Sequence, residues 1–341
     1  MNLPNITDVP LSQLPQIVTG LGIKRYAADQ IVSWLYKKKV SSFDEMTNLS
    51  IKAREILNTS YSIEKNEIEK IVEAPDKTKK FLFAFSDGSR VESVLIPAMD
   101  DRLTICVSTE VGCAMGCGFC RTSHMGFKRD LTQGEILSQL IDVQRLCDKD
   151  KEIITNIVFM GMGEPLVNYD SVLGAIQIIL SERAFNFSKR RVTLSTSGLV
   201  PQLEKLMTDI DIRLAISLNA TTNSVRNKLM PINKRYPIES IMEFAQKYTK
   251  KTKNAITFEY VVIKDINDTD KDMERLVKLM KGIRAKINLI PFNPFSGSEY
   301  KSPSEKTILE FHKYLTDRHI QTNIRISRGQ GIMAACGQLA A

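Results

Sequence analysis

The first part of the chain, up to about residue 60, has apolar residues at helical spacing and predicts a set of short helices. One of these helices is expected at residues 24–38. It places Ile31, Trp34 and Leu35 on one face and ends in a basic run, Lys37-Lys38-Lys39. Because an apolar face needs a partner to cover it, we expect these helices to pack together as a small bundle.

The pattern then changes to that of strands. Residues 67–72, 79–85 and 91–96 have the composition of β-strands, and a turn around Asp87-Gly88 joins the last two into a hairpin. We therefore expect residues 1–97 to form an N-terminal accessory region, with helices first and short strands after them.

From residue 103 onward, strands and helices alternate, which favours an α/β architecture with a mainly parallel sheet. The expected strands are residues 103–108, 156–160, 191–195, 212–217, 256–263 and 286–290. Six such units fit a partial (β/α)6 barrel better than the eight of a closed barrel. The barrel is expected to span residues 98–300, and residues 301–341 are expected to add a helix, a strand and a cysteine-bearing tail.

Helix starts in the barrel region have recognisable caps. Thr132 and Glu135 form a predicted capping box, and the helix that follows carries an apolar face of Ile136, Leu140, Val143 and Cys147. A second apolar face consists of Ile238, Ile241, Met242 and Ala245. The last helix is expected to begin at Ser302, with Pro303 in its first position.

The composition is that of an ordinary globular protein, and the charge adds one hint. The 341 residues are 43% hydrophobic and 25% charged, with a net charge of +8 and a pI near 9.0. A basic protein suits a polyanionic partner, although charge alone is weak support. The sequence has no predicted signal peptide or membrane helix, so we expect a cytoplasmic, monomeric protein without a membrane partner.

The six cysteines are distributed unevenly. Cys113, Cys117 and Cys120 share one segment with C-x3-C-x2-C spacing, and Cys106 lies seven residues upstream of the first. Cys336 is near the end of the sequence, and Cys147 is expected in the core. Clustered cysteines in a cytosolic protein of this size indicate metal or redox chemistry rather than a disulfide framework.

Three cysteines, rather than four, are the informative number. A structural zinc site needs four ligands, often as two C-x2-C pairs, and no second pair exists here. A 4Fe-4S cluster held by three cysteines leaves one iron open for a small molecule such as S-adenosylmethionine. The alternatives are a zinc site completed by His124 and a loop of unliganded cysteines.

At this point the chain resembles the radical-SAM superfamily, in which this cysteine spacing follows the first strand of a partial (β/α)6 barrel. Further motifs follow the later strands: Gly161-Met-Gly-Glu-Pro-Leu166, Ser195-Thr-Ser-Gly198, Ser217-Leu-Asn-Ala220, Ile290-Pro-Phe-Asn-Pro294 and Ala334-Ala-Cys-Gly-Gln-Leu339. Together they are similar to the RlmN/Cfr family of RNA methyltransferases, over most of residues 90–339. The resemblance implies a 4Fe-4S cluster and S-adenosylmethionine as cofactors.

The resemblance also assigns residues to the bound S-adenosylmethionine. Its contacts would be Gly163, Glu164, Ser195, Ser217, Leu218, Asn219 and Asn293. Asn219 stands where histidine is common in the family, and Gln330-Gly-Ile-Met333 stands where an acidic residue often precedes the cysteine of the tail. These departures bear on the fine geometry of the cysteine loop and on the RNA contacts of the tail, and not on the class of reaction.

The same resemblance gives catalytic roles to Cys336, Cys106 and Glu92. Cys336 would accept a methyl group, and a radical derived from a second S-adenosylmethionine would activate that group for addition to adenine. Cys106 would then form a disulfide with Cys336 and release the product, while Glu92 would accept the proton from the base. Without the resemblance, Cys106 is an ordinary buried cysteine and Glu92 a solvent-facing residue on a strand.

The partners expected from the family are 23S rRNA near the peptidyl-transferase centre, tRNA at the adenosine 3′ of the anticodon, and an electron donor such as flavodoxin or ferredoxin. Basic segments at 188–191, at Arg325 with Arg328, and near Lys37 are candidates for phosphate contacts. Pro165 and Pro291-Phe292 favour methylation of carbon 2 over the carbon-8 reaction of the Cfr type. The alternative of another class is an RNA-binding protein with a structural iron–sulfur cluster.

Overall fold

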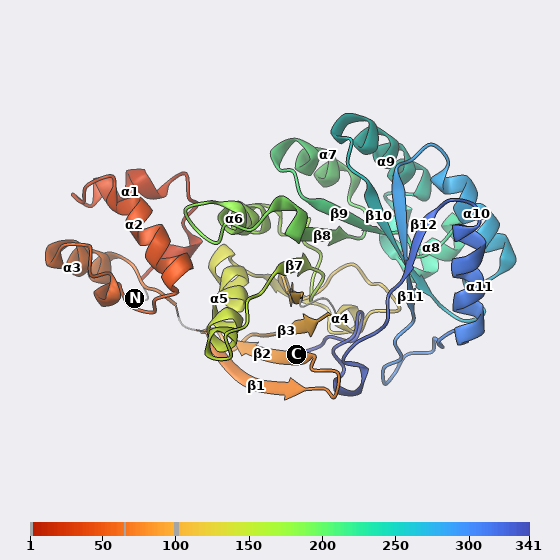
Figure 1. Cartoon of the computed structure of the whole chain (residues 1–341), viewed down its shortest axis with the longest axis horizontal. Coiled ribbons are helices and arrows are strands. Elements are labelled where there is room, and N and C mark those ends of the chain that lie inside the picture. Colours follow the sequence, from red (N-terminus) through yellow and green to blue (C-terminus); the bar gives the residue numbers. More distant parts are fainter. Residues whose placement is uncertain (1–2, 65, 99–101) are drawn as a thin grey trace.

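The computed structural model describes residues 3–64, 66–98 and 102–341, and a single large sheet runs through most of it (Figure 1). The sheet has ten strands in the order β1-β2-β3-β4-β7-β8-β9-β10-β11-β12. They are β1 (Glu67–Glu73), β2 (Lys79–Ala84), β3 (Arg90–Pro97), β4 (Leu103–Val107), β7 (Asn156–Phe159), β8 (Val192–Thr196), β9 (Arg213–Ser217), β10 (Ile256–Val262), β11 (Ala285–Pro291) and β12 (Gln321–Ile324).

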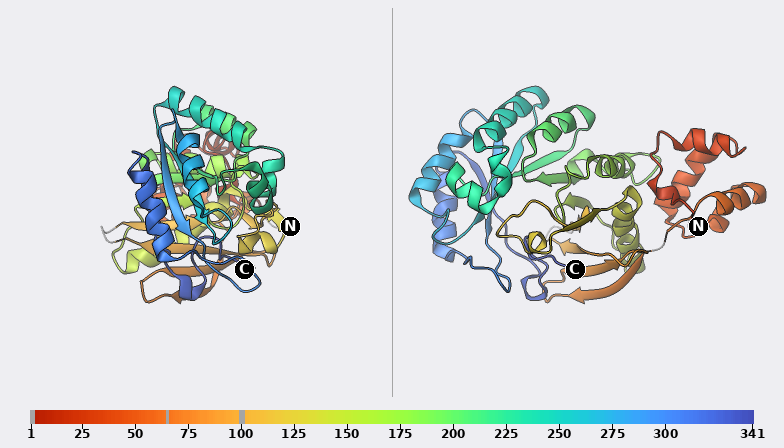
Figure 2. Two further views of the ribbon diagram at one scale, coloured as in Figure 1. Left: turned by 90° about the vertical axis from the view of Figure 1, so that its right-hand side faces the viewer. Right: turned by 180° about the vertical axis from the view of Figure 1, so that it is seen from behind.

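Six of these strands, β4 and β7 to β11, are parallel neighbours and confirm the six strands predicted for the barrel. The predicted C-terminal strand is β12, which adds to β11 in parallel. The sheet is curved and open, and helices cover its outer face (Figures 1 and 2). These helices are α5 (Gln133–Lys149), α6 (Tyr169–Leu180), α7 (Val200–Asp209), α8 (Asn223–Leu229), α9 (Ile238–Thr252), α10 (Asp270–Met280) and α11 (Glu305–Thr316).

The predicted hairpin strands belong to the same sheet as the barrel. Strands β1, β2 and β3 pair antiparallel, and β3 pairs antiparallel with β4, with Val94 opposite Cys106. The turn predicted at Asp87-Gly88 is present, with Gly88 at a φ of 80°. The N-terminal strands therefore place their side chains directly beside the first barrel strand.

The N-terminal helices form a separate group at one end of the molecule (Figure 1). They are α1 (Leu14–Gly20), α2 (Ala27–Val32), which continues as a π-helix over Ser33–Lys38, and α3 (Ile51–Ser60). The group contacts the start of α5, where Gly134 N–H donates to Asp8 Oδ1 at 2.7 Å. A Cβ at Gly134 would lie 2.3 Å from Thr7 Oγ1, so this contact requires glycine.

Of the two predicted helix starts, one is confirmed and one is wrong. The capping box of Thr132 and Glu135 is present at the start of α5. In contrast, α11 begins two residues later than predicted. Ser304 caps it by accepting from Thr307 N–H at 3.1 Å, whereas the Ser302 hydroxyl donates to the Phe292 carbonyl. Ser302 has a tertiary partner in the loop after β11, and this outweighs the local preference for proline in the first helical position.

Parallel strands bring all their carboxyl ends to one edge, and the loops after β4, β7, β8, β9, β10 and β11 meet there. Two short strands, β5 (Glu110–Gly112) and β6 (Phe127–Asp130), and the one-turn helix α4 (Arg121–His124) build the longest of these loops. In the described ranges we find no helix that combines the length and the apolar character required to span a bilayer.

Candidate active site

The cysteine loop is anchored by a close backbone contact at its base. Gly112 has a φ of 79°, and a Cβ there would lie 1.8 Å from the Gly126 carbonyl oxygen. The neighbouring Cys113 N–H donates to that same oxygen at 3.0 Å. Only glycine allows the two strands of the β5–β6 hairpin to approach this closely, so the sequence fixes where the loop begins.

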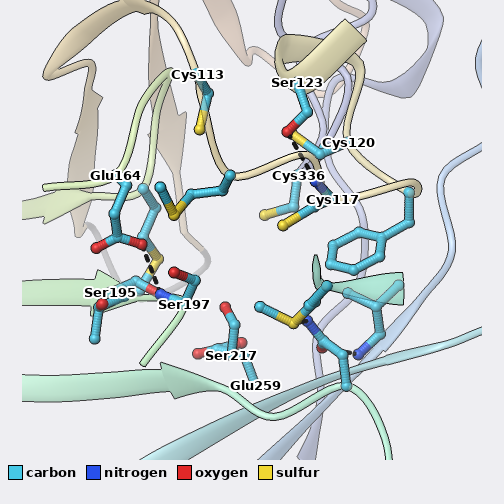
Figure 3. Close-up of a pocket in the computed structure, with 18 of the residues that line it drawn as sticks. Cys113, Cys117, Cys120, Ser123, Glu164, Ser195, Ser197, Ser217, Glu259 and Cys336 are labelled. Carbon is cyan, nitrogen blue, oxygen red and sulfur yellow. Dashed lines mark hydrogen bonds between the residues drawn. The ribbon is translucent and has the colours of Figure 1, made fainter. Parts of the chain in front are cut away.

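The three cysteines of the loop line one pocket at the carboxyl edge of the sheet (Figure 3). Cys113 and Cys117 are buried, and the Cys117 N–H donates to Ser123 Oγ at 3.2 Å. Burial raises the pKa of Cys113 to about 12, and it also raises the pKa of Cys117. Thiolates at these positions therefore need positive charge from a bound group, which the irons of a cluster supply.

The arrangement does not fit a single metal ion. Within the described residues, no three His, Cys, Asp or Glu side chains are grouped closely enough to coordinate one ion. His124, the fourth ligand of the zinc alternative, packs edge-on against Phe295 with ring centroids 5.4 Å apart. Three thiols spread around a pocket suit a cluster of several irons better than one zinc.

The loop after β7 places Glu164 at the floor of this pocket. Gly163 has a φ of 103°, and a Cβ there would lie 2.7 Å from the Cβ of Glu110. Glu164 is buried, and its two carboxylate oxygens accept from Ser197 N–H at 2.7 Å and Leu166 N–H at 3.2 Å. Burial raises its pKa, and a cation placed beside it would counteract this by favouring the ionised carboxylate.

Most of the other residues predicted to hold S-adenosylmethionine line the same pocket, namely Ser195, Ser217, Asn219 and Asn293. Asn219 has a φ of 55°, a conformation that asparagine tolerates well, and its Oδ1 accepts from Val261 N–H at 2.8 Å. Leu218 is buried outside the pocket lining, and its carbonyl accepts from Arg226. Of the residues predicted to contact this cofactor, only the Leu218 side chain lies away from the pocket.

Three further residues at this site were not predicted. Ser197 and Glu259 line the pocket, and Arg226 is completely buried beneath it. Ser197 lies inside a motif that the sequence did reveal. Glu259 is a lone acid in an otherwise apolar strand, which is a usable signal, and burial raises its pKa. No pattern marks Arg226.

Arg226 connects the loops after β8 and β9. Its guanidinium donates to the carbonyls of Ser197, Ser217 and Leu218 at 2.7, 3.0 and 3.0 Å. Burial lowers its pKa to about 10, and among the described residues no carboxylate is paired with it. A buried cation that holds two ligand-binding loops together both positions the loops and adds positive charge next to the pocket.

The tail brings Cys336 from the end of the chain to the cysteine loop. Figure 3 shows Cys336 beside Cys117 and Cys120, with Cys113 on the other side of the pocket. Cys336 also lines a second pocket, which contains Cys106 and shares the wall formed by Cys120, Met160 and Gly161. Its side chain is exposed where these two cavities meet, and desolvation raises its pKa.

Hydrogen bonds from several elements hold the tail in place. The main anchors are Arg121 N–H to the Gly337 carbonyl at 2.7 Å and Asn293 Nδ2 to the Cys336 carbonyl at 3.0 Å. Gln330 donates to Asn293 Oδ1 at 2.8 Å, and Gln338 donates to the Pro294 carbonyl at 2.8 Å. Gln330, which departs from the family pattern, therefore helps to hold the residue that positions Cys336.

Cys106 lies at the end of β4 and is buried. Burial raises its pKa to about 12, and the nearby Cys336 contributes to the rise. All six cysteines are free thiols in this structure. The structure thus brings Cys106 and Cys336 to one cavity, while Cys147 lies in the core as predicted.

Glu92 is buried and does not face solvent as its strand pattern suggests. Its carboxylate pairs with Lys80 Nζ at 2.8 Å and accepts from Ala340 N–H at 2.8 Å. It therefore binds the end of the tail, four residues after Cys336, and is not part of either pocket lining. The tail covers this position of β3 through Ala340, which alternation along one strand cannot reveal.

The second pocket has a basic lining. It includes Arg102, Arg213, Arg325 and Arg328 together with the two thiols. Arg191, from the predicted basic segment, donates to Asn156 Oδ1 at 3.1 Å, and Asn156 lines this pocket as well. The predicted arginines of the tail thus lie where an anionic substrate would meet Cys336.

Comparison with known protein families gives two matches. Residues 107–280 match the radical SAM superfamily, and residues 4–63 match the ribosomal RNA large subunit methyltransferase N-terminal domain. The first match includes the cysteine loop and the loops after β7, β8 and β9. The second coincides with the separate group of N-terminal helices.

Several curated proteins and one crystal structure are similar over nearly the whole chain. The dual-specificity RNA methyltransferase RlmN of Syntrophotalea carbinolica is 46% identical over 339 residues, covering 99% of this chain and 89% of the relative. The protein of the same name from Desulfosudis oleivorans is 48% identical over 320 residues, covering 94% and 86%. The crystal structure of a radical SAM methyltransferase from Sphaerobacter thermophilus is 39% identical, with a TM-score of 0.94 and coverage of 98% and 99%.

Proposed function

The chain belongs to the RlmN family of radical SAM RNA methyltransferases, and from this premise we propose that it methylates carbon 2 of adenine in RNA. The family uses a 4Fe-4S cluster and S-adenosylmethionine. We propose 23S rRNA and tRNA as the substrates, because the relatives are named dual-specificity RNA methyltransferases and the N-terminal match is to a ribosomal RNA methyltransferase domain.

One observation carries this proposal. Cys336 lines both the pocket of the cluster cysteines and the pocket that contains Cys106. A purely structural cluster gives no reason for a distant cysteine to be held at that junction by hydrogen bonds to α4 and to the loop after β11. A methyl carrier has to meet the activating group on one side and the RNA base on the other, and Cys336 occupies such a position.

The cofactors and the protein divide the chemistry between them. When bound to Cys113, Cys117 and Cys120, the cluster together with S-adenosylmethionine supplies the methyl group and the radical that activates it. Glu164 and Ser195 would bind the polar groups of S-adenosylmethionine, and Arg226 would hold their loops in place. The apolar walls of the pocket exclude water from this chemistry.

The two thiols carry the covalent steps. Cys336 Sγ holds the methyl carbon, which would lose one hydrogen atom to the radical and bond to carbon 2 of the base. The adduct would then lose one electron to the oxidised cluster and the carbon-2 proton, which leaves the carbon bonded to both Cys336 Sγ and the base. Cys106 Sγ then attacks Cys336 Sγ and the sulfur–carbon bond breaks. The carbon keeps the bond's electron pair and takes up a proton to become the methyl group of the product. A disulfide remains, and two electrons from an external thiol must reduce it before the next turnover.

Glu92 is proposed as the acceptor of the carbon-2 proton. Its carboxylate forms an ion pair with Lys80 Nζ at 2.8 Å. In the structure it binds the Ala340 N–H, so it reaches the base only when the end of the tail moves. RNA binding would supply that movement.

The experiment that tests this function is anaerobic. The reconstituted enzyme is incubated with methyl-labelled S-adenosylmethionine, a reductant and RNA, and the RNA is digested to nucleosides. We expect labelled 2-methyladenosine from both a 23S rRNA fragment and tRNA. Labelled 8-methyladenosine would assign the chain to the carbon-8 reaction instead, and absence of 5′-deoxyadenosine would contradict radical chemistry altogether.

A further inference from the structure

The cysteine loop has an inner face and an outer face. Cys113, Met115 and Cys117 line the pocket, whereas Ala114 and Gly116 alternate with them and are exposed. At these two positions only the loop itself separates the cluster site from solvent. A redox partner that delivers an electron needs the shortest path, and the outer face of this loop provides it.

The outer face continues onto α8 and the 3-10 helix Pro231–Lys234. The Gly118 N–H donates to the Leu229 carbonyl at 3.0 Å, and a Cβ at Gly116 would lie 3.5 Å from Pro231 Cγ. Pro231 is itself exposed. The loop and these two helices therefore form one continuous surface.

This surface is basic. Lys228, Lys234 and Arg235 are exposed, and Lys234 lies one 3-10 turn after Pro231, on the same side of that helix. Within the described ranges, neither Lys228 nor Lys234 has an ion-pair partner, and Arg235 stacks on the ring of Tyr236 at 5.4 Å. Three cations without acidic partners are available to an acidic partner protein.

The basic surface is distinct from the arginines of the second pocket. Arg213, Arg325 and Arg328 line the cavity that contains both Cys106 and Cys336, where the RNA base has to react. None of Lys228, Lys234 and Arg235 lines either pocket. The two positive regions are therefore separate: one lines the cavity that contains the thiols, and the other is exposed on α8 and the 3-10 helix that follows it.

We propose that the outer surface formed by Ala114, Gly116, Lys228, Pro231, Lys234 and Arg235 is the docking site of a small acidic one-electron carrier protein. The carrier loses one electron and the cluster gains it, with no transfer of atoms. Complementary charge raises the rate of encounter, and the exposed backbone at Gly116 brings the carrier's redox group close to the cluster. The inference rests on the proposed radical chemistry.

The test compares a protein donor with a small one. In the reconstituted enzyme, Lys228→Glu, Lys234→Glu and Arg235→Glu are combined, and a bacterial flavodoxin in its hydroquinone form serves as the carrier. We expect its Kd to rise and its rate of cluster reduction to fall by at least about tenfold at low salt, since three attractive charges become repulsive. The rate of reduction by dithionite, which needs no docking, should stay the same.

A matched control reverses three charges elsewhere, through Lys250→Glu, Lys251→Glu and Lys281→Glu. The first two residues end α9, at the opposite edge of the sheet from the cysteine loop. These changes should leave flavodoxin binding nearly unchanged. A charge-neutral set, Lys228→Ala, Lys234→Ala and Arg235→Ala, is expected to show a smaller loss and covers the case in which the glutamate set does not retain its cluster.

Two results would overturn the docking site. One is a flavodoxin Kd and reduction rate that neither set of substitutions changes. The other is a loss of RNA affinity with unchanged flavodoxin binding, which would make this surface a phosphate-binding face. Failure of the proposed function is recognised separately, because the unsubstituted enzyme would then bind and accept electrons from flavodoxin without producing 5′-deoxyadenosine.

Discussion

The cysteine loop and the cysteine tail meet in one pocket, but they are held there by different means. The loop is built into the barrel, with its base set by the contact of Gly112 with the Gly126 carbonyl and its end packed on Leu229. The tail has little regular structure after β12. Arg121 and Asn293 donate hydrogen bonds to its backbone carbonyls, and Glu92 accepts one from its Ala340 N–H. The site therefore consists of a preformed half, the cysteine loop, and a docked half, the tail that carries Cys336.

This difference separates two tasks. A cluster requires fixed thiols, and a loop formed by strand pairing provides them. A methyl carrier has to change its contacts during the cycle, and a segment held mainly by single hydrogen bonds, each contributing about 1 kcal/mol, can do so. If the loop is preformed and the tail is docked, substitutions in the loop should remove the cluster. Substitutions in the tail should stop only the later steps of the methylation reaction.

The largest effect is expected from Cys117→Ala in the loop. The variant should lose most of its iron and all cleavage of S-adenosylmethionine, because a cluster held by two thiols is not retained. Iron content, the visible absorption of the cluster and the yield of 5′-deoxyadenosine measure this. A variant that keeps its iron and its cleavage activity would remove Cys117 from the cluster.

The second-largest effect is expected from substitution of the two thiols that do not hold the cluster. Cys336→Ala and Cys106→Ala should both abolish methylation while keeping iron content near that of the unsubstituted enzyme. Cys336→Ala should form no methylated enzyme, whereas Cys106→Ala should accumulate RNA joined to Cys336, detectable by denaturing gel and mass spectrometry. Loss of iron in Cys336→Ala would mean that the two halves are not independent.

Substitution of one glycine in the loop and one in the tail provides a matched test of how much each segment contributes to stability. Gly112→Ala places a methyl group 1.8 Å from a backbone oxygen at a φ of 79°, and Gly337→Ala places one 3.0 Å from the Phe119 carbonyl at a φ of 82°. We expect Gly112→Ala to lower the free energy of unfolding by about 3 kcal/mol and Gly337→Ala by about 1 kcal/mol, because the tail can shift. Denaturant unfolding of the cluster-free protein measures both, and equal losses would contradict a docked tail.

The pH dependence of product release follows from the ionisation of the Cys106 thiol. Its thiol must lose a proton to attack, and burial raises its pKa to about 12. The thiolate fraction below that value grows about tenfold for each pH unit, so the rate of disulfide formation should rise steadily between about pH 7 and pH 9 without a plateau. Single-turnover release of methylated RNA measures it, with the yield of 5′-deoxyadenosine as the internal control. A plateau in this range would show that Cys106 ionises more easily when RNA is bound.

The most local effect is expected from Gln338→Ala in the tail. Its amide donates to the Pro294 carbonyl and its Oε1 accepts from Ala335 N–H. Loss of these bonds should destabilise the docked tail by about 1–2 kcal/mol and leave the cluster intact. Hydrogen exchange should become faster in the tail and not in the cysteine loop. Faster exchange in both would show that the halves unfold together.

The preformed half could be predicted well from the sequence, because the residues that mark it lie within short segments of the chain. Strand periodicity located the carboxyl edge, and the cysteine and glycine spacings that follow β4 and β7 placed the loop residues there. The docked half depends on tertiary contacts that no local pattern encodes. The partner of Glu92 is Ala340, far along the chain, and the Ser302 hydroxyl is taken up by the Phe292 carbonyl instead of capping a helix. Arg226 was missed for the same reason, since its partners are carbonyl groups.

Because Cys336 lines both pockets, its side chain is part of the partition between two chambers. On the proposed mechanism its sulfur would face the cluster cysteines first and the basic cavity, where RNA would bind, afterwards. A bond to Cys106 would draw the sulfur to the other side and open the partition at the moment when no reactive group remains. The residue that carries the methyl group would thereby also control the traffic between the chambers.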